Sequence, residues 1–343
     1  AADPDRAVAA IHDMLRRAGA TVLAERDPAV LAKAIKNPVE IAGHRSAQAR
    51  DGAAMVRFLK WFEETAPSGT LTELSASDRL EAIRTETGCL RDLSFDTISA
   101  TGGHAASPHY KATVDSDAPI LQGQLYLIDS GGQYPDGTTD ITRVMPVGDV
   151  TDEMRDRFTR VLKGHIAIDT AIFPDGTLGG HIDGFARRPL WEAGLDYAHG
   201  TGHGIGAFLS VHEGPQRIGA PNYPGGGPME PLRAGMMLSN EPGYYKAGEY
   251  GIRIENLILT VERPVPGGDL SMLGFETLTF VPIERSLIVP ALLTEQERAW
   301  VDVYHARVEA LLTPLLDLET TAWLAAKCAF VQSQEFSIHQ RIP

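Results

Sequence analysis

Cysteine is nearly absent from this sequence. Its 343 residues include two cysteines, Cys89 and Cys328, which lie far apart and form no CxxC pair. A disulfide framework and a cysteine-based zinc site are therefore excluded, and so few cysteines fit the reducing environment of the cytoplasm.

Positive charge and long hydrophobic runs are also scarce. Lys and Arg number 31 against 45 Asp and Glu, which leaves a net charge of −14. This balance, without a dense run of Lys and Arg, argues against nucleic-acid binding. No apolar run approaches the roughly 18–20 residues of a membrane span, so we expect no membrane insertion. What remains is an ordinary globular composition, 43% hydrophobic and 22% charged, in a chain long enough to bury a sizeable core.

The first 36 residues read as a small unit of their own. Their pattern predicts a helix over 4–18, a short strand over 20–24 and a second helix over 27–35. One strand with two helices cannot form a sheet, so we expect the remnant of a preceding domain with weak contacts to the rest. A chain beginning near residue 34 should then be about as stable. The alternative, a strand that docks on the main sheet, stays open.

The rest of the chain repeats one order of elements. A helix begins after Asn37, a plausible N-cap followed by Pro38, and the pattern predicts another over 71–87. Further predicted elements are strands over 96–99, 112–114, 124–129 and 140–145, helices over 153–172 and 179–193, and strands over 236–240, 251–261 and 278–282. Two units of helices followed by antiparallel strands indicate an α+β fold with internal duplication. A last helix over 294–312 opens with a capping box, and 332–343 should be a loose tail.

Four carboxylates stand in strand-like segments. Asp129 and Asp140 lie on the two arms of a predicted hairpin, so both can reach one point across adjacent strands. Turn chemistry and a solvated strand end are the alternative explanation of this pair. Glu241 and Glu255 lie on two further strands, and Glu255 sits in the apolar run IRIENLIL, where an unpaired carboxylate is costly. The cation that it needs is either a metal or Arg253, which lies on the same strand face.

Histidines complete the pattern. The segment HGTGHGIGAFLSVHEGP carries His199, His203 and His212 among five glycines, which let the backbone approach a ligand closely. His109 is isolated, and from its chemistry alone a core or surface role is the better expectation. Four carboxylates and two divalent cations balance to zero charge, so these residues suit a two-metal hydrolytic site in which a bridging water loses a proton near neutral pH.

These residues and their contexts resemble the M24 metallopeptidases, whose fold is called pita-bread. The resemblance runs from about residue 37 to 315 and rests on Asp129, Asp140, His203, Glu241 and Glu255. The motifs EPGYY and GIRIEN are similar to aminopeptidase P and prolidase. The HGTGHGIGAFLSVHEGP segment most resembles the long aminopeptidase P branch, as does the stretch PIERSLIVPALLTEQERAWVDVYHARV.

The resemblance implies a role for each residue. Asp129 would bind one metal, His203 and Glu241 the other, and Asp140 and Glu255 both. Glu241 would also accept a proton from the bridging water. His109 would stabilise the tetrahedral intermediate, and this role replaces the core or surface role expected from its chemistry alone. His212 would hold the scissile peptide group. His199 and Arg253 would shape the proline pocket.

The implied protein is an aminopeptidase. It would release the first residue from peptides with proline second, by attack of a metal-bridging hydroxide; prolidase activity on Xaa-Pro dipeptides is the main alternative, and an inert binding module a lesser one. An oxygen-rich ligand set favours two Mn²⁺ ions per chain, with Co²⁺ or Zn²⁺ as substitutes. The expected partners are proline-containing peptides, with a homodimer left open. We expect a catalytic domain over 37–285 and a helical extension with a tail over 286–343.

Overall fold

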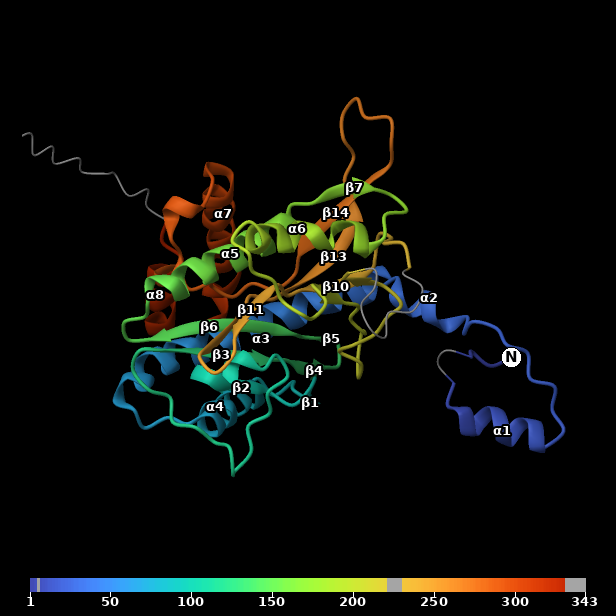
Figure 1. The fold of residues 1–343 in the computed structure, drawn as a ribbon, viewed down its shortest axis with the longest axis horizontal. Coiled ribbons are helices and arrows are strands. Elements are labelled where there is room, and N and C mark those ends of the chain that lie inside the picture. Colours follow the sequence, from blue (N-terminus) through green and yellow to red (C-terminus); the bar gives the residue numbers. More distant parts are fainter. Residues whose placement is uncertain (5–6, 221–229, 331–343) are drawn as a thin grey trace, which may run out of the picture.

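Helices surround short antiparallel strands in the computed structural model, which describes residues 1–4, 7–220 and 230–330 (Figure 1). The α-helices of these residues are α1 (Ala9–Arg17), α2 (Ala29–Ala34), α3 (Pro38–Thr65), α4 (Glu73–Thr85), α5 (Asp152–Asp169), α6 (Gly179–Trp191), α7 (Glu295–Leu312) and α8 (Leu318–Lys327). The strands are β1 (Asp92–Leu93), β2 (Ile98–Thr101), β3 (Gln124–Ser130), β4 (Gly132–Tyr134), β5 (Gly137–Thr138), β6 (Ile141–Val147), β7 (Ile172–Pro174), β8 (Gly202–His203), β9 (Arg217–Ile218), β10 (Met237–Asn240), β11 (Gly243–Lys246), β12 (Tyr250–Arg253), β13 (Asn256–Glu262) and β14 (Met272–Thr277).

The first structural unit is built from α3, α4 and the antiparallel sheet β2-β3-β6. Helix α3 begins where predicted, because the Asn37 side chain accepts hydrogen bonds from the backbone N–H groups of Val39 and Glu40. Phe58 and Phe62 on α3 are fully buried, and Phe62 stacks on Tyr126 of β3. The predicted hairpin is formed by β3 and β6, and the stretch between its arms folds into the short strands β4 and β5.

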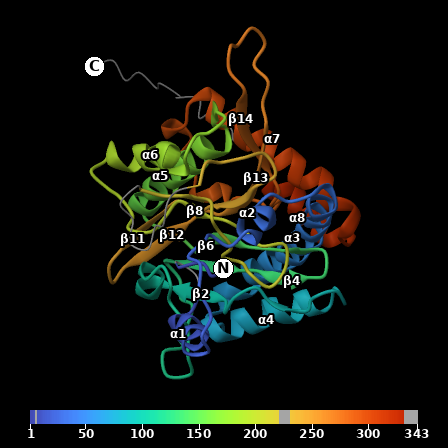
Figure 2. The same cartoon turned by 90° about the vertical axis from the view of Figure 1, so that its right-hand side faces the viewer.

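The second unit repeats this order with α5, α6 and the sheet β10-β13-β14-β7. Figure 2 shows the strands in the middle, with α5 and α6 on one side and α3 and α4 on the other. Two successive helix-then-sheet units confirm the α+β fold with internal duplication.

Three strand predictions are wrong, each for a physical reason. Residues 112–114 form no strand, since Val114 is 88% exposed and has no sheet to pack against. Residues 278–282 are largely buried but form no strand. The Val281 N–H donates to the Tyr304 hydroxyl, and the Val281 carbonyl accepts from Arg143, so side chains take the place of a neighbouring strand. The strand of that region is β14, just before it. The predicted strand 251–261 is interrupted at Ile254 and Glu255, which separates β12 from β13.

The N-terminal segment divides into two parts with different contacts. Helix α1 has no buried residue and stands apart from the rest of the chain (Figure 1). Helix α2 packs on the second unit through buried Ala34 and partly buried Leu31, and the Lys36 N–H donates to the carbonyl of Gly235. The expectation of weak contacts therefore holds for α1 and is wrong for residues 29–36. The predicted strand 20–24 is wrong as well, since it is reduced to a single bridge between Ala2 and Ala24.

The C-terminal helices belong to the main core. Thr294 and Glu297 form the predicted capping box of α7. Val308 of α7 and Leu324 of α8 are fully buried in the same cluster as Val161 of α5. The predicted tail, 332–343, lies outside the described residues. Within the described part of the chain, no helix is long and apolar enough to cross a membrane.

Candidate metal centre

The four predicted carboxylates meet between the two structural units. Asp129 lies in β3 and Asp140 directly precedes β6, while Glu241 directly follows β10 and Glu255 directly precedes β13. All four line a cavity of about 320 Å³ together with His203. The structure therefore brings together all five residues that the sequence proposed as ligands.

Strand register explains why the carboxylates converge. Ser130 of β3 pairs with Ile141 of β6. Asp129 comes just before Ser130 and Asp140 just before Ile141, so the two aspartates lie diagonally across the two strands, one on each side of that pair. Asn240 and Asn256 form the last pair of β10 and β13. Glu241 and Glu255 stand just beyond that pair, where both chains leave the sheet and are free to turn into the cavity.

His203 reaches the carboxylates through a close backbone contact. A Cβ at Gly202 would lie 2.0 Å from the Ser239 carbonyl oxygen, so only glycine lets β8 approach β10 so closely. The His203 N–H donates to Ser239 Oγ at 2.9 Å. Its Nε2 then lies 3.4 Å from Asp140 Oδ2 and 3.6 Å from Glu241 Oε1.

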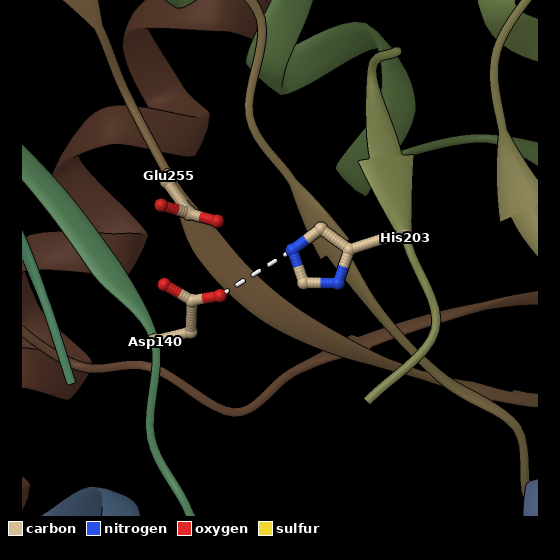
Figure 3. Close-up of side chains that lie close together, drawn as sticks. All are labelled: Asp140, His203 and Glu255. Carbon is tan, nitrogen blue, oxygen red and sulfur yellow. Dashed lines mark ion pairs between the residues drawn. The ribbon is translucent and has the colours of Figure 1, made fainter. Parts of the chain in front are cut away.

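Three of the five residues point at one small volume. Asp140, His203 and Glu255 each offer a ligand atom, and these atoms all lie within 4.8 Å of one another (Figure 3). A single cation placed among them could contact all three side chains. Carboxylate and imidazole ligands in this proportion suit a divalent metal.

The electrostatics of the cluster also call for cations. Burial, followed by repulsion from Asp129 and Glu241, raises the pKa of Asp140 well above its usual range. Burial and the neighbouring Asp140 do the same to the pKa of Glu255. The Asp129 Oδ1 atom is buried and has no hydrogen-bond partner. An unpartnered buried acceptor and self-repelling carboxylates are what two divalent cations would neutralise, so these residues fit the implied metals.

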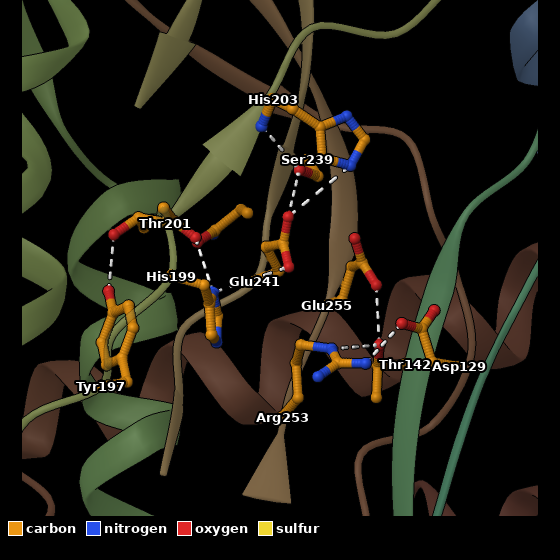
Figure 4. Close-up of polar contacts among 12 residues, drawn as sticks. Asp129, Thr142, Tyr197, His199, Thr201, His203, Ser239, Glu241, Arg253 and Glu255 are labelled. Carbon is orange, nitrogen blue, oxygen red and sulfur yellow. Dashed lines mark hydrogen bonds and ion pairs between the residues drawn. The ribbon is translucent and has the colours of Figure 1, made fainter. Parts of the chain in front are cut away.

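Arg253 holds the opposite side of the cluster. Its guanidinium donates to Asp129 Oδ2 and to Thr142 Oγ1, and Thr142 donates to Glu255 Oε2 at 2.7 Å (Figure 4). The ion pair considered between Arg253 and Glu255 is therefore replaced by one with Asp129. The reason is the break between β12 and β13, which removes the shared strand face.

The remaining predicted residues surround the five. His109 and His212 are exposed to solvent and line the same cavity, so both are accessible to a bound molecule. The rings of His203 and His212 lie 4.1 Å apart. His199 is buried, and burial together with the Arg253 charge lowers its pKa to about 3. Its Nδ1 donates to the Gly200 carbonyl, so Nε2 accepts from the Tyr245 hydroxyl at 2.8 Å.

Sequence reasoning missed three polar side chains of this site. Thr142 and Ser239 each bond a carboxylate, and Tyr245 joins His199 to Arg253. Thr142 lies two residues after Asp140, a spacing that shares a face in the strand predicted over 140–145 and could have indicated it. Tyr245 belongs to the quoted EPGYY motif, but nothing local shows which way it points.

The fold and this site define a pita-bread protein with a carboxylate-rich candidate metal centre. Residues 42–262 match metallopeptidase family M24, and residues 271–331 match the C-terminal region of peptidase M24. The chain belongs to the metallopeptidase family M24, which confirms the family inferred from its motifs.

Individual members of this family and their solved structures are similar to the chain over most of its length. A probable Xaa-Pro aminopeptidase P of Laccaria bicolor is 50% identical over 333 residues, covering 95% of this chain and 51% of that protein. The crystal structure of an X-prolyl aminopeptidase from Caenorhabditis elegans, described as a cytosolic enzyme with a di-nuclear active site, has a TM-score of 0.85 at 41% identity and covers 90% of this chain and 50% of that one. An Xaa-Pro dipeptidase from Bacillus anthracis has a TM-score of 0.68 at 26% identity, covering 82% of this chain and 72% of that one. The chain spans about half the length of the curated relatives it matches.

Proposed function

We propose that this chain carries the catalytic part of an Xaa-Pro aminopeptidase, which releases the first residue of peptides with proline second. The observation that carries the proposal is the convergence of five ligand-type side chains and two accessible histidines, His109 and His212, on one cavity. The likeness to an aminopeptidase P of Laccaria bicolor and to the X-prolyl aminopeptidase of Caenorhabditis elegans supports it.

The five residues would hold two divalent cations. We assign Asp129 to one metal, His203 and Glu241 to the other, and Asp140 and Glu255 to both. The central position of Asp140 and Glu255 in the repulsive cluster supports their sharing of two charges. Four carboxylates against one imidazole favour Mn²⁺, with Co²⁺ or Zn²⁺ as substitutes. Bound metals of this kind supply Lewis acidity and lower the pKa of a water molecule.

The protein's own groups would carry the protons and position the substrate. Glu241 accepts a hydrogen bond from Ser239, and burial raises its pKa, so it is suited to receive a proton inside the cavity. His109 and His212, both exposed at the cavity, would stabilise the developing oxyanion and hold the peptide group. His199 and Arg253, joined through Tyr245, would form a fixed wall for the proline ring.

Cleavage of Xaa-Pro dipeptides is the second candidate, favoured by the structural likeness to the Bacillus anthracis dipeptidase. Arg-Pro-Pro and a panel of Xaa-Pro dipeptides distinguish the two when incubated with the Mn²⁺-loaded chain. We expect release of free arginine from Arg-Pro-Pro. Cleavage of dipeptides alone would replace the proposal by prolidase activity, and Mn²⁺ binding without cleavage of either would indicate a binding module.

We also propose a cytoplasmic location, because the Caenorhabditis elegans relative is described as cytosolic.

A further inference from the structure

His165 lies near the C-terminal end of α5 and is not among the residues that line the cavity. Its side chain is fully buried, and its ring packs edge-on against Trp300 with the two ring centroids 5.9 Å apart. Nothing in the sequence analysis selected this residue, and no role in the proposed reaction uses it. Its contacts nevertheless reach both glutamates of the site through the backbone.

The imidazole touches the two carbonyls that precede Glu241 and Glu255. Its Nδ1 lies 3.1 Å from the Asn240 carbonyl oxygen and 3.2 Å from that of Ile254. Its Nε2 lies 3.2 Å from Asn256 Nδ2, one residue beyond Glu255. The Asn240 side chain in turn donates to the His165 carbonyl at 3.0 Å. One residue of a rigid helix is thus bonded to both turns that carry glutamate ligands.

These contacts lie in the short gap between two strand ladders. The ladder between β10 and β13 ends at the pair Asn240 and Asn256, and the ladder between β11 and β12 begins at Gly243 and Arg253. In the gap that holds Glu241 and Glu255, the two turns share one long backbone hydrogen bond, from the Ile254 N–H to the Pro242 carbonyl at 3.3 Å. The His165 N–H adds a second tie, because it is bonded to both carbonyls that precede the glutamates. Burial, followed by the charge of Arg143, lowers the pKa of His165 to about 3. The ring is therefore neutral, with Nδ1 as donor and Nε2 free to accept from Asn256.

We propose that His165 is a positioning residue that sets the separation of the Glu241 and Glu255 carboxylates and thereby the affinity of the centre for divalent cations. This inference rests on the metal site of the proposed function. Residues that orient metal ligands typically change affinity about 10–100-fold when they are replaced. The loss should fall on both metals, since under the proposed assignment the two glutamates together would hold both.

Calorimetric titration of the metal-free chain with Mn²⁺ tests the inference. We compare the unaltered protein with His165→Leu, which removes every ring hydrogen bond, and with His165→Gln, whose amide can still donate. We expect Mn²⁺ to bind His165→Leu about 10–100-fold more weakly. The His165→Gln variant should recover part of the affinity, and circular dichroism in chelator shows whether each variant is folded before metal is added.

His305 provides the matched control. It is another fully buried histidine, but it accepts a hydrogen bond from the Ile283 N–H and touches neither glutamate turn. His305→Gln should bind Mn²⁺ as the unaltered chain does. Equal affinity in folded His165 and His305 variants would overturn the inference, and if His165→Leu does not fold, equal affinity of His165→Gln and the unaltered chain would do so. A failure of the unaltered chain to bind Mn²⁺ would instead contradict the proposed function.

Discussion

At the scale of single residues, the site is governed by repulsion among carboxylates. Asp140 and Glu255 are buried beside each other, and both have raised pKa values. Arg253 donates a hydrogen bond to Asp129 and is linked to Glu255 by hydrogen bonds through Thr142, and its charge opposes the rise in the pKa of both inner carboxylates. Both pKa values stay raised despite this charge, so divalent cations would further stabilise the ionised inner pair.

Asp140→Asn should remove most bound Mn²⁺ and nearly all peptidase activity, because an amide is a weaker ligand and the cluster loses a charge shared by two metals. Elemental analysis after dialysis and hydrolysis of Arg-Pro-Pro measure the two effects. The metal-free variant should unfold at the same temperature as the metal-free parent or higher, since it has lost a repulsive charge. Full activity with two metals bound would contradict the bridging assignment.

His109→Ala and His212→Ala should affect rate without affecting metal content. Both side chains line the cavity from its exposed side, and neither belongs to the five-residue cluster. We expect two metals per chain and a kcat lower by about 10²-fold, as is typical for loss of one oxyanion-stabilising or proton-handling group. Metal loss in either variant, measured by the same elemental analysis, would place that histidine among the ligands.

At the scale of elements, the beginning of the chain behaves as two parts. Helix α1 contributes no buried residue, whereas α2 buries Val30 and Ala34, and Ala34 lies in the apolar cluster of the second unit. Beyond α2, the Lys36 side chain is fully buried and lies 3.4 Å from Glu213, the residue after His212. Helix α1 therefore adds nothing to the buried core, whereas residues 29–36 are packed on the second unit.

Two shortened chains test this division. Removal of residues 1–26 should leave the unfolding temperature within about 2 °C of the parent, since α1 buries nothing. Removal of residues 1–36 should lower it by roughly 5 °C, because a buried Val side chain alone contributes about 1.5–3 kcal/mol. Differential scanning calorimetry at one metal concentration measures both. Equal unfolding temperatures for the two shortened chains would show that α2 contributes nothing to stability.

At the scale of the whole molecule, stability should depend on pH through buried histidines. Burial, aided by the charge of Lys36, lowers the pKa of His44 to about 4, and burial likewise lowers the pKa of His305 to about 4. Between pH 6.5 and 4 the unfolded chain binds these protons and the folded chain does not. As the pH is lowered through that window, the free energy of unfolding therefore decreases by about 1.4 kcal/mol per pH unit for each histidine.

His44→Gln isolates one of these contributions from the other groups that titrate in the same window. Its free energy of unfolding, from urea titrations between pH 6 and 4.5, should fall less steeply than that of the parent, by about 1.4 kcal/mol per pH unit. Above pH 7 the two slopes should coincide. Parallel slopes at low pH would mean that folded His44 is protonated as readily as in the unfolded chain.

Local chemistry is why much of this molecule could be predicted from sequence. The Asn37 cap, the β3–β6 hairpin and the duplicated order of elements depend on neighbours in the chain, and they were predicted correctly. The strand predicted over 112–114 is absent because no neighbouring strand lies beside these residues to form a sheet with them. The buried stretch 278–282 failed because Tyr304 and Arg143 supply bonds that a neighbouring strand would otherwise supply.

The sequence by itself determined the α+β class, the family and the identity of the five ligand-type residues, since these depend on the local pattern of elements and on short motifs around each residue. Only the tertiary structure decided which groups surround them. Arg253 turned to Asp129, Tyr245 joined His199 to Arg253, and His165 reached both glutamate turns. Each of these contacts joins segments from different parts of the chain. Their geometry is set by strand ends, where the regular side-chain alternation that sequence reasoning relies on stops.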